Sequence, residues 1–188
     1  MAEAVREIDG VKLPQPGKYE LDQAHTAIEF VARHILTKVR GRFTDFTGWI
    51  DVAEDPLQSH VHVEVKTSSI QTNVGQRDEH LKSDDFLNVE KWPVMTFDST
   101  AIRHTGGRSF ELDGELTIRD VTRSVTLSGE YLGIDTNPYG KTVLAATART
   151  TLKREDWNVS WNMVLETGGF LVSKEIDLEI EVEAIKVG

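Results

Sequence analysis

The feature that most constrains this chain is an alternation of apolar and polar residues along most of its length. It is clearest in residues 174–187, KEIDLEIEVEAIKV, where Ile176, Leu178 and Ile180 alternate with acidic residues. Successive side chains of a β-strand point to opposite faces, so this pattern predicts strands with one apolar face and one solvated face. The same pattern recurs in residues 26–36, 48–54, 60–66, 94–100, 109–120 and 123–133.

Turn-forming residues separate the predicted strands, among them Gly106-Gly107, Gly168-Gly169 and the Asn-Pro-Tyr-Gly run at 137–140. About eight strands joined by such turns predict an all-β fold, either an antiparallel barrel or a sandwich, and the alternation alone does not separate the two. Several inward positions carry small residues, which either leave space inside a barrel or fit its taper. These positions are Ala32, Gly114, Gly129, Ala146 and Ala148.

The length of 188 residues predicts a single domain with a short extension. Residues 1–17 precede the first alternating segment and contain Pro14 and Pro16, so we expect a loosely held, extended N-terminal arm. Residues 18–188 form the predicted barrel domain. Because the first residues include acids and no apolar run, we expect no secretory signal peptide and a cytoplasmic location.

Charge and cysteine content exclude several classes of protein. The chain has 21 Lys and Arg against 31 Asp and Glu, which makes the formal net charge −10. Since the basic residues are scattered, we expect neither nucleic-acid binding nor stable membrane insertion. No segment approaches the about 20 apolar residues of a membrane-spanning helix. The absence of cysteine excludes disulfides and thiolate metal sites.

One charged segment interrupts the alternation: QRDEHLKSDDFLNVEKWPVMTF, residues 76–97. Residues 75–88 can form about three helical turns, and the chain must leave the helix before Pro93. A helix of this kind buries its apolar side against the wall or the mouth of a barrel. We therefore expect a short helix over 75–88 that caps the barrel, either above a ligand or as a packing plug.

No residue pattern marks a metal site or a catalytic site. His60 and His62 share a strand face with Glu64 and Lys66, and such a charged face is typical of a solvated exterior. His25 and His34 are expected to be buried, hydrogen-bonding histidines. Nucleophile elbows, phosphate-binding loops and metalloprotease motifs are absent from the sequence, so we predict no enzyme and no metal.

Five segments, taken in order, resemble the YceI-like family of bacterial proteins. They are YELDQAHTAIEFVARHILTKVRGRFTDFTGWI (19–50), RDEHLKSDDFLNVEKWPVMTFDST (77–100), GELTIRDVTRSVTL (114–127), LKREDWNVSW (152–161) and GFLVSKEIDLEIEVEA (169–184). The resemblance implies an eight-stranded, antiparallel, lipocalin-like barrel whose apolar lumen takes a long isoprenoid chain or another amphiphilic lipid. It also implies a homodimer.

The combined pattern predicts a protein that binds, stores or transports such a lipid, with an isoprenoid quinone and a polyprenyl phosphate as candidate ligands and no other cofactor. Two alternatives stay open: an enzyme acting on a bound lipid or quinone, for which His25, His34 and Tyr131 are loose candidates, and a non-binding structural or stress-related protein. The head group is expected near the helix, beside Arg77 and His80. The predicted lining consists of Ile28, Phe30, Ile50, Val52, Val63, Val65, Phe86, Phe97, Leu116, Ile118, Leu127, Leu144, Ala146, Leu178 and Ile180.

Overall fold

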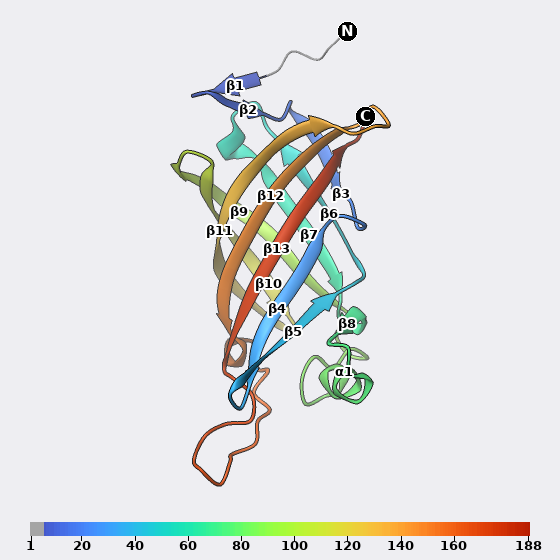
Figure 1. Ribbon diagram of the computed structural model, residues 1–188, viewed down its shortest axis with the longest axis vertical. Coiled ribbons are helices and arrows are strands. Elements are labelled where there is room, and N and C mark those ends of the chain that lie inside the picture. Colours follow the sequence, from blue (N-terminus) through green and yellow to red (C-terminus); the bar gives the residue numbers. More distant parts are fainter. Residues whose placement is uncertain (1–5) are drawn as a thin grey trace.

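The computed structural model describes residues 6–188 and shows one long, strongly curved antiparallel sheet (Figure 1). The part of the predicted N-terminal arm that spans residues 1–5 lies outside the described residues. The strands of the sheet are β3 (Gly17–Leu21), β4 (Ala27–His34), β5 (Thr37–Phe43), β6 (Phe46–Val52), β7 (His60–Lys66), β8 (Ile70–Gln71), β9 (Val94–Gly106), β10 (Ser109–Ile118), β11 (Val121–Thr136), β12 (Thr142–Lys153) and β13 (Glu175–Lys186).

The sheet closes on itself because β12 and β13 pair along their whole length, from Val143 with Ile185 to Lys153 with Glu175. On its other edge β13 pairs with β3 near its end and with β4 near its start. The segments β3 and β4 therefore act as one interrupted strand, and β5 and β6 act as another beside it. The expected eight-stranded, antiparallel, lipocalin-like barrel is confirmed, and the sandwich is not formed.

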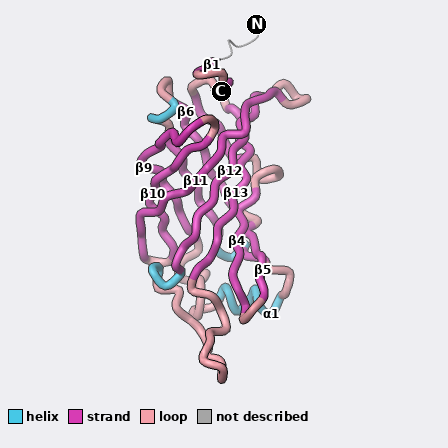
Figure 2. The backbone as a smooth tube through the Cα atoms, turned by 60° about the vertical axis from the view of Figure 1, so that its left-hand side comes forward, coloured by secondary structure: helices cyan, strands magenta, loops and turns pink. Residues whose placement is uncertain are grey.

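The two ends of the barrel differ (Figures 1 and 2). We call the end with the termini the upper end and the end with α1 (Gly75–Lys82) the lower end. At the upper end Tyr19 and Ala184 are fully buried and pack with Val52 and Leu144. This apolar cluster fills the upper part of the barrel.

A hairpin of β1 (Arg6–Ile8) and β2 (Val11–Leu13) lies over the upper end. The prolines of this segment predicted only a loosely held arm. The hairpin is attached through Tyr131, whose hydroxyl donates to the Lys12 carbonyl oxygen at 2.8 Å, and through Arg6, which donates to the Ala53 carbonyl oxygen at 3.2 Å.

The helix at the lower end is shorter than expected. It ends at Lys82, and residues 83–92 continue as turns in which the Phe86 and Asn88 amides both donate to the Ser83 carbonyl oxygen. The expected short helix is confirmed, but its predicted range of 75–88 was wrong, and the half-buried Leu81 is the residue that α1 contributes to the cavity wall. The following turns instead bury Phe86 and Leu87 against the barrel.

Three short 3₁₀ segments complete the fold: Pro56–Gln58, Thr67–Ser69 and Arg154–Trp157. The last of these follows β12 at the lower end. Residues 158–174 then form a long loop that projects beyond the barrel before β13 begins (Figures 1 and 2).

Candidate functional site

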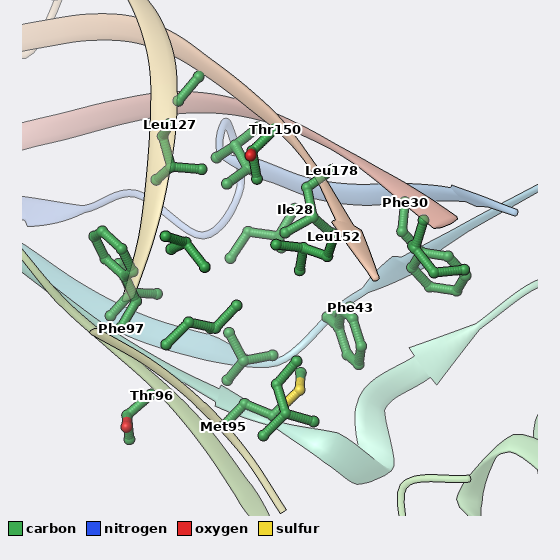
Figure 3. Close-up of a pocket in the computed structure, with 18 of the residues that line it drawn as sticks. Ile28, Phe30, Phe43, Met95, Thr96, Phe97, Leu127, Thr150, Leu152 and Leu178 are labelled. Atoms are coloured by element: carbon green, nitrogen blue, oxygen red, sulfur yellow. The ribbon is translucent and has the colours of Figure 1, made fainter. Parts of the chain in front are cut away.

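An apolar cavity occupies the barrel below the upper cluster. Its void is about 270 Å³, whereas a single water molecule needs about 10–15 Å³. Figure 3 shows side chains from several strands around this space, among them Ile28, Phe97 and Leu127. The wall is almost entirely hydrocarbon. Its polar members are Thr26, Thr96, Thr150 and Arg154.

Most of the predicted lining residues lie on this wall. They occupy the alternate strand positions whose side chains face the interior of the barrel. The exception is Phe86, which comes from the turns after α1. The alternation thus identified the inner face correctly, while the binding of a ligand by these residues stays a prediction. Those on the wall are Ile28, Phe30, Ile50, Val63, Val65, Phe86, Phe97, Leu116, Ile118, Leu127, Leu178 and Ile180.

Three predicted lining residues do not border the cavity. Val52 and Leu144 belong to the packed upper cluster. Ala146 lies opposite Tyr131 on β11 and Val182 on β13, just above the cavity wall. The period of two tells which face a residue occupies but not its height along the barrel, so the sequence could not separate the filled part from the hollow part.

The two head-group candidates are engaged elsewhere and do not line the cavity. The Arg77 side chain donates to the Thr72 hydroxyl at 2.7 Å and to the Thr72 carbonyl oxygen at 2.9 Å. The His80 ring lies 2.7 Å from an Asp85 carboxylate oxygen and packs edge-on against Trp161. Their local spacing on the helix was read correctly, but the helix turns them away from the lumen.

The most consequential wall residue that sequence reasoning missed is Arg154. It is 6 % exposed, and its burial lowers the pKa of the guanidinium from its ordinary value. Its sequence context, Lys-Arg-Glu-Asp, reads as a solvated charged turn. Only the docking of the 158–174 loop over the end of β12 encloses this side chain.

Residues from irregular segments were missed as well, because they carry no periodic signal. Leu87 comes from the turns after α1, and Trp157 from the 3₁₀ segment. The Trp157 indole donates to the Leu116 carbonyl oxygen at 3.0 Å, which closes the wall between β10 and the 3₁₀ segment. Phe43 ends β5, an alternating strand that the sequence analysis did not single out, and Ile70 belongs to the two-residue strand β8.

The histidines lie outside the cavity. His34 is exposed and the His25 side chain is 64 % exposed, so the expectation that both are buried was wrong. His25 hydrogen-bonds Asp22 at 2.8 Å, and this bond, together with the charges of Asp22 and Glu183, raises the pKa of His25. Ligand atoms of these three residues lie within 4.8 Å of one another and could approach a cation.

His60 and His62 pack against the ring of Trp49 on the outer face of the sheet. The centroids of their rings lie 5.4 and 5.5 Å from the centroid of the Trp49 ring. His62 also bonds the Asp98 carboxylate at 2.6 Å. Both therefore belong to the polar outer face of the sheet, as their alternation with valines indicated.

These features define a closed, eight-stranded antiparallel β-barrel with an apolar internal cavity. A family model described as the YceI-like domain matches residues 19–184, and the chain belongs to this family. A UPF0312 protein of Pseudomonas paraeruginosa is 36 % identical over 172 residues, covering 89 % of this chain and 86 % of the relative.

Solved structures show the same fold. The Campylobacter jejuni YceI protein superposes with a TM-score of 0.71 at 28 % identity, covering 81 % of this chain and 88 % of that one. A domain from Saccharophagus degradans, described as polyisoprenoid-binding and implicated in plant cell wall breakdown, superposes with a TM-score of 0.68 at 11 % identity. It covers 92 % of this chain and 100 % of that one. Among residues 6–188, no helix is long and apolar enough to cross a membrane.

Proposed function

We propose that this protein reversibly binds a long-chain isoprenoid, or a similar amphiphilic lipid, inside the barrel and carries or stores it. The observation that carries the proposal is the cavity itself, which is enclosed by the closed sheet and lined almost only by hydrocarbon. The polyisoprenoid-binding description of the Saccharophagus degradans domain, which shares the fold, agrees with this choice of ligand.

The free energy of transferring the lipid into the barrel favours reversible binding over effectively irreversible binding. An isoprenoid of about 40 carbons gains roughly 30 kcal/mol on leaving water, at about 0.8 kcal/mol for each buried methylene group. This exceeds the practical ceiling on affinity of about 20 kcal/mol, so ordering of the chain must offset part of it. In the cell such a lipid starts in a membrane, where it is already out of water. The net gain on entering the barrel is therefore small, and release is correspondingly easy.

A catalytic role has less support from the geometry. The loose candidates for catalysis were His25, His34 and Tyr131. None of them borders the cavity, because both histidines are exposed and Tyr131 belongs to the upper cluster. The wall instead offers threonine hydroxyls and one arginine, a set suited to holding a ligand in place.

The decisive experiment is native mass spectrometry of the protein purified from its own host, followed by solvent extraction and lipid analysis. We expect an adduct with the mass of an isoprenoid lipid, which organic solvent removes. Protein that carries no lipid, and that takes up no isoprenoid alcohol or fatty acid from vesicles, would contradict the proposal and favour the non-binding alternative.

The assembly and location expected from the sequence are also part of the proposal. We infer that the protein acts as a homodimer in the cytoplasm. Light scattering coupled to gel filtration tests the first point, with a mass near twice the 21.1 kDa of the chain expected. Fractionation of host cells tests the second.

A further inference from the structure

We propose that the bound lipid carries an oxyanion head group, a carboxylate or a phosphate, and that Arg154 binds it at the lower end of the cavity. This inference rests on the proposed function and adds the chemical class of the head group and its place. It moves the head-group site from the helix, where the sequence suggested it, to the base of the barrel.

Arg154 carries a buried charge into apolar surroundings. Among residues 6–188, Arg154 is the one charged residue in the buried class, and it borders a cavity that is otherwise apolar. Within the same residues it forms no ion pair at 4.0 Å or less, and its neighbours at hydrogen-bond distance are neutral carbonyl groups. A buried charge without a counter-charge is costly, and an anion beside it offsets that cost.

Two of the three guanidinium nitrogens of Arg154 have hydrogen-bond acceptors, and the third has none. Nε donates to the Ser173 carbonyl oxygen at 2.8 Å, and Nη1 donates to the carbonyl oxygens of Val159 and Trp161 at 2.7 and 2.9 Å. These bonds hold the plane of the group. Nη2 is buried and has no acceptor among the described residues. A pre-oriented donor of this kind suits a carboxylate or phosphate oxygen.

The Arg154 guanidinium group lies beside the apolar wall of the cavity. The guanidinium carbon lies 6.0 Å from the centroid of the Phe86 ring, which is itself a wall residue from the turns after α1. A head group at the lower end of the cavity would therefore lie beside the guanidinium group, because Arg154 and Phe86 both border the cavity there. The chain of the lipid would then extend upward along the apolar wall.

The test compares three probes with the same isoprenoid chain: geranylgeranoic acid, geranylgeranyl monophosphate and the neutral alcohol geranylgeraniol. Binding to the wild-type protein is measured by displacement of a fluorescent fatty-acid analogue. We expect the acid or the phosphate to bind at least about tenfold more tightly than the alcohol. The tighter of the two anions identifies the source of the oxyanion.

Equal or tighter binding of the alcohol would overturn this inference while leaving the proposed function intact. If none of the three probes binds, the proposed function fails and this inference fails with it. In Arg154→Met the preference for the anion should fall to about one, with binding of the alcohol retained. Arg119→Met is the matched control, since Arg119 likewise has one buried guanidinium nitrogen without a hydrogen-bond partner, its Nε, but does not border the cavity. Because the wild-type comparison needs no variant, a folding defect in Arg154→Met leaves the test decisive.

A separate observation carries a second inference. The β4–β5 turn and the 158–174 loop lie at the lower extremity of the molecule (Figures 1 and 2). Both carry exposed apolar side chains. The two segments are joined, since the Ile35 amide donates to the Leu171 carbonyl oxygen at 3.0 Å and His34 forms a bridge with Val172. We call this surface the apolar tip. It comprises Ile35, Leu36, Met163, Val164 and Phe170.

We infer that the apolar tip docks on the surface of an anionic lipid membrane. Exposed Arg33 and Lys38 flank it, and Lys174 at the end of the loop pairs with Glu155 at 3.4 Å. The loop itself carries one acid, Glu166, whereas the whole chain has a formal net charge of −10. Cations beside exposed apolar residues are the combination that an anionic membrane surface attracts. Val172, on the same loop, borders the cavity, so the tip adjoins the compartment that the lipid must enter. The acidic remainder of the protein keeps the contact transient.

The test is flotation of the protein with vesicles of phosphatidylcholine alone or with about one third phosphatidylglycerol. We expect binding only to the anionic vesicles, reduced by added salt, and a several-fold loss in Leu36→Asp, whose side chain is 85 % exposed. Tyr139→Ser is the control at the opposite end, since Tyr139 is 88 % exposed in the β11–β12 turn. Absence of binding to anionic vesicles, or an equal loss in both variants, would overturn the inference.

Discussion

Three glycines of the barrel wall, Gly41, Gly114 and Gly129, lie beneath phenylalanine rings of neighbouring strands. The sequence left open whether small inward residues, Gly114 and Gly129 among them, leave space in the barrel or fit its taper. At these glycines the absent side chain makes room for a ring, as Gly114 does for Phe97. Space is left instead beside Ala32 and Ala148, which border the cavity.

Gly114→Ala should therefore destabilise the protein. An added Cβ would lie 2.4 Å from the Phe97 ring and 2.7 Å from the Asp98 carbonyl oxygen, so both ring and backbone must shift. We expect a loss of about 1–3 kcal/mol in the free energy of unfolding, measured by urea denaturation. Gly75→Ala is the control because nothing lies within 4 Å of its added Cβ, and it should be neutral or slightly stabilising. A neutral Gly114→Ala would show that the wall is looser than described.

His25 gives a prediction about pH. The hydrogen bond that the His25 ring donates to the Asp22 carboxylate raises the pKa of His25 above its ordinary 6.5, so protonated His25 contributes stability below pH 6.5 that is lost as the pH rises through the raised pKa. The same bond lowers the pKa of Asp22 below 3.8, so the stability that Asp22 contributes is lost as the pH falls through that lowered value. The ion pair is therefore intact between the two pKa values.

The measurement is an NMR titration of the His25 ring C–H signal in the wild-type protein and in Asp22→Asn. We expect the pKa of His25 to fall toward 6.5 in the variant, with part of the shift retained because Glu183 remains nearby. The asparagine can still accept from the Ala24 amide, as Asp22 does at 2.9 Å, so the turn should persist. An unchanged pKa would show that the Asp22–His25 bond does not form in solution.

At the scale of elements, the segment after β8 illustrates how a charged interruption contributes to the core. The helix α1 is short and largely solvated, and the following turns carry the buried residues. Asn88 adopts a left-handed backbone conformation (φ 46°), which the turn requires and a continuous helix would not. The sequence located this interruption correctly but assigned its apolar residues to a helix face.

Phe86→Ala tests the importance of these turns. Phe86 is 6 % exposed, borders the cavity and contacts the rings of His80 and Trp161 at centroid distances of 5.1 and 5.3 Å. We expect a loss of about 3–5 kcal/mol in the free energy of unfolding, measured by guanidinium denaturation followed by circular dichroism. Val74→Ala, 46 % exposed at the start of the same segment, should cost well under 1 kcal/mol. Similar losses in the two variants would contradict the packing described.

At the scale of the whole molecule, the barrel is filled above and hollow below. The upper cluster around Tyr19 and Ala184 packs like an ordinary core, whereas the lower part encloses the cavity. The lower end is also where Arg154 and the apolar tip lie. Both further inferences therefore place ligand recognition and membrane contact at the same end.

A cavity-filling variant tests the hollow part. Ala148→Phe places a large ring on the cavity wall, and Ala101→Phe adds the same ring at an exposed position of β9. We expect Ala148→Phe to reduce lipid uptake at least tenfold with folding retained, and Ala101→Phe to leave uptake unchanged. Uptake is measured by native mass spectrometry after incubation with isoprenoid-loaded vesicles. Equal uptake by both variants would place the ligand outside the barrel.

The sequence by itself determined most of the strands, their inward faces and the charged interruption at 76–97, because a period of two fixes which side chains share a face. It also carried the family resemblance that the family match confirms. Only the tertiary structure decided where along the barrel the interior is hollow. The position of a side chain along the barrel axis depends on strand register, and rings such as that of Phe97 lie over glycines of neighbouring strands. The burial of Arg154 was likewise decided by the tertiary structure, because the 158–174 loop packs over this side chain. Contacts made by an irregular loop leave no periodic pattern in the sequence.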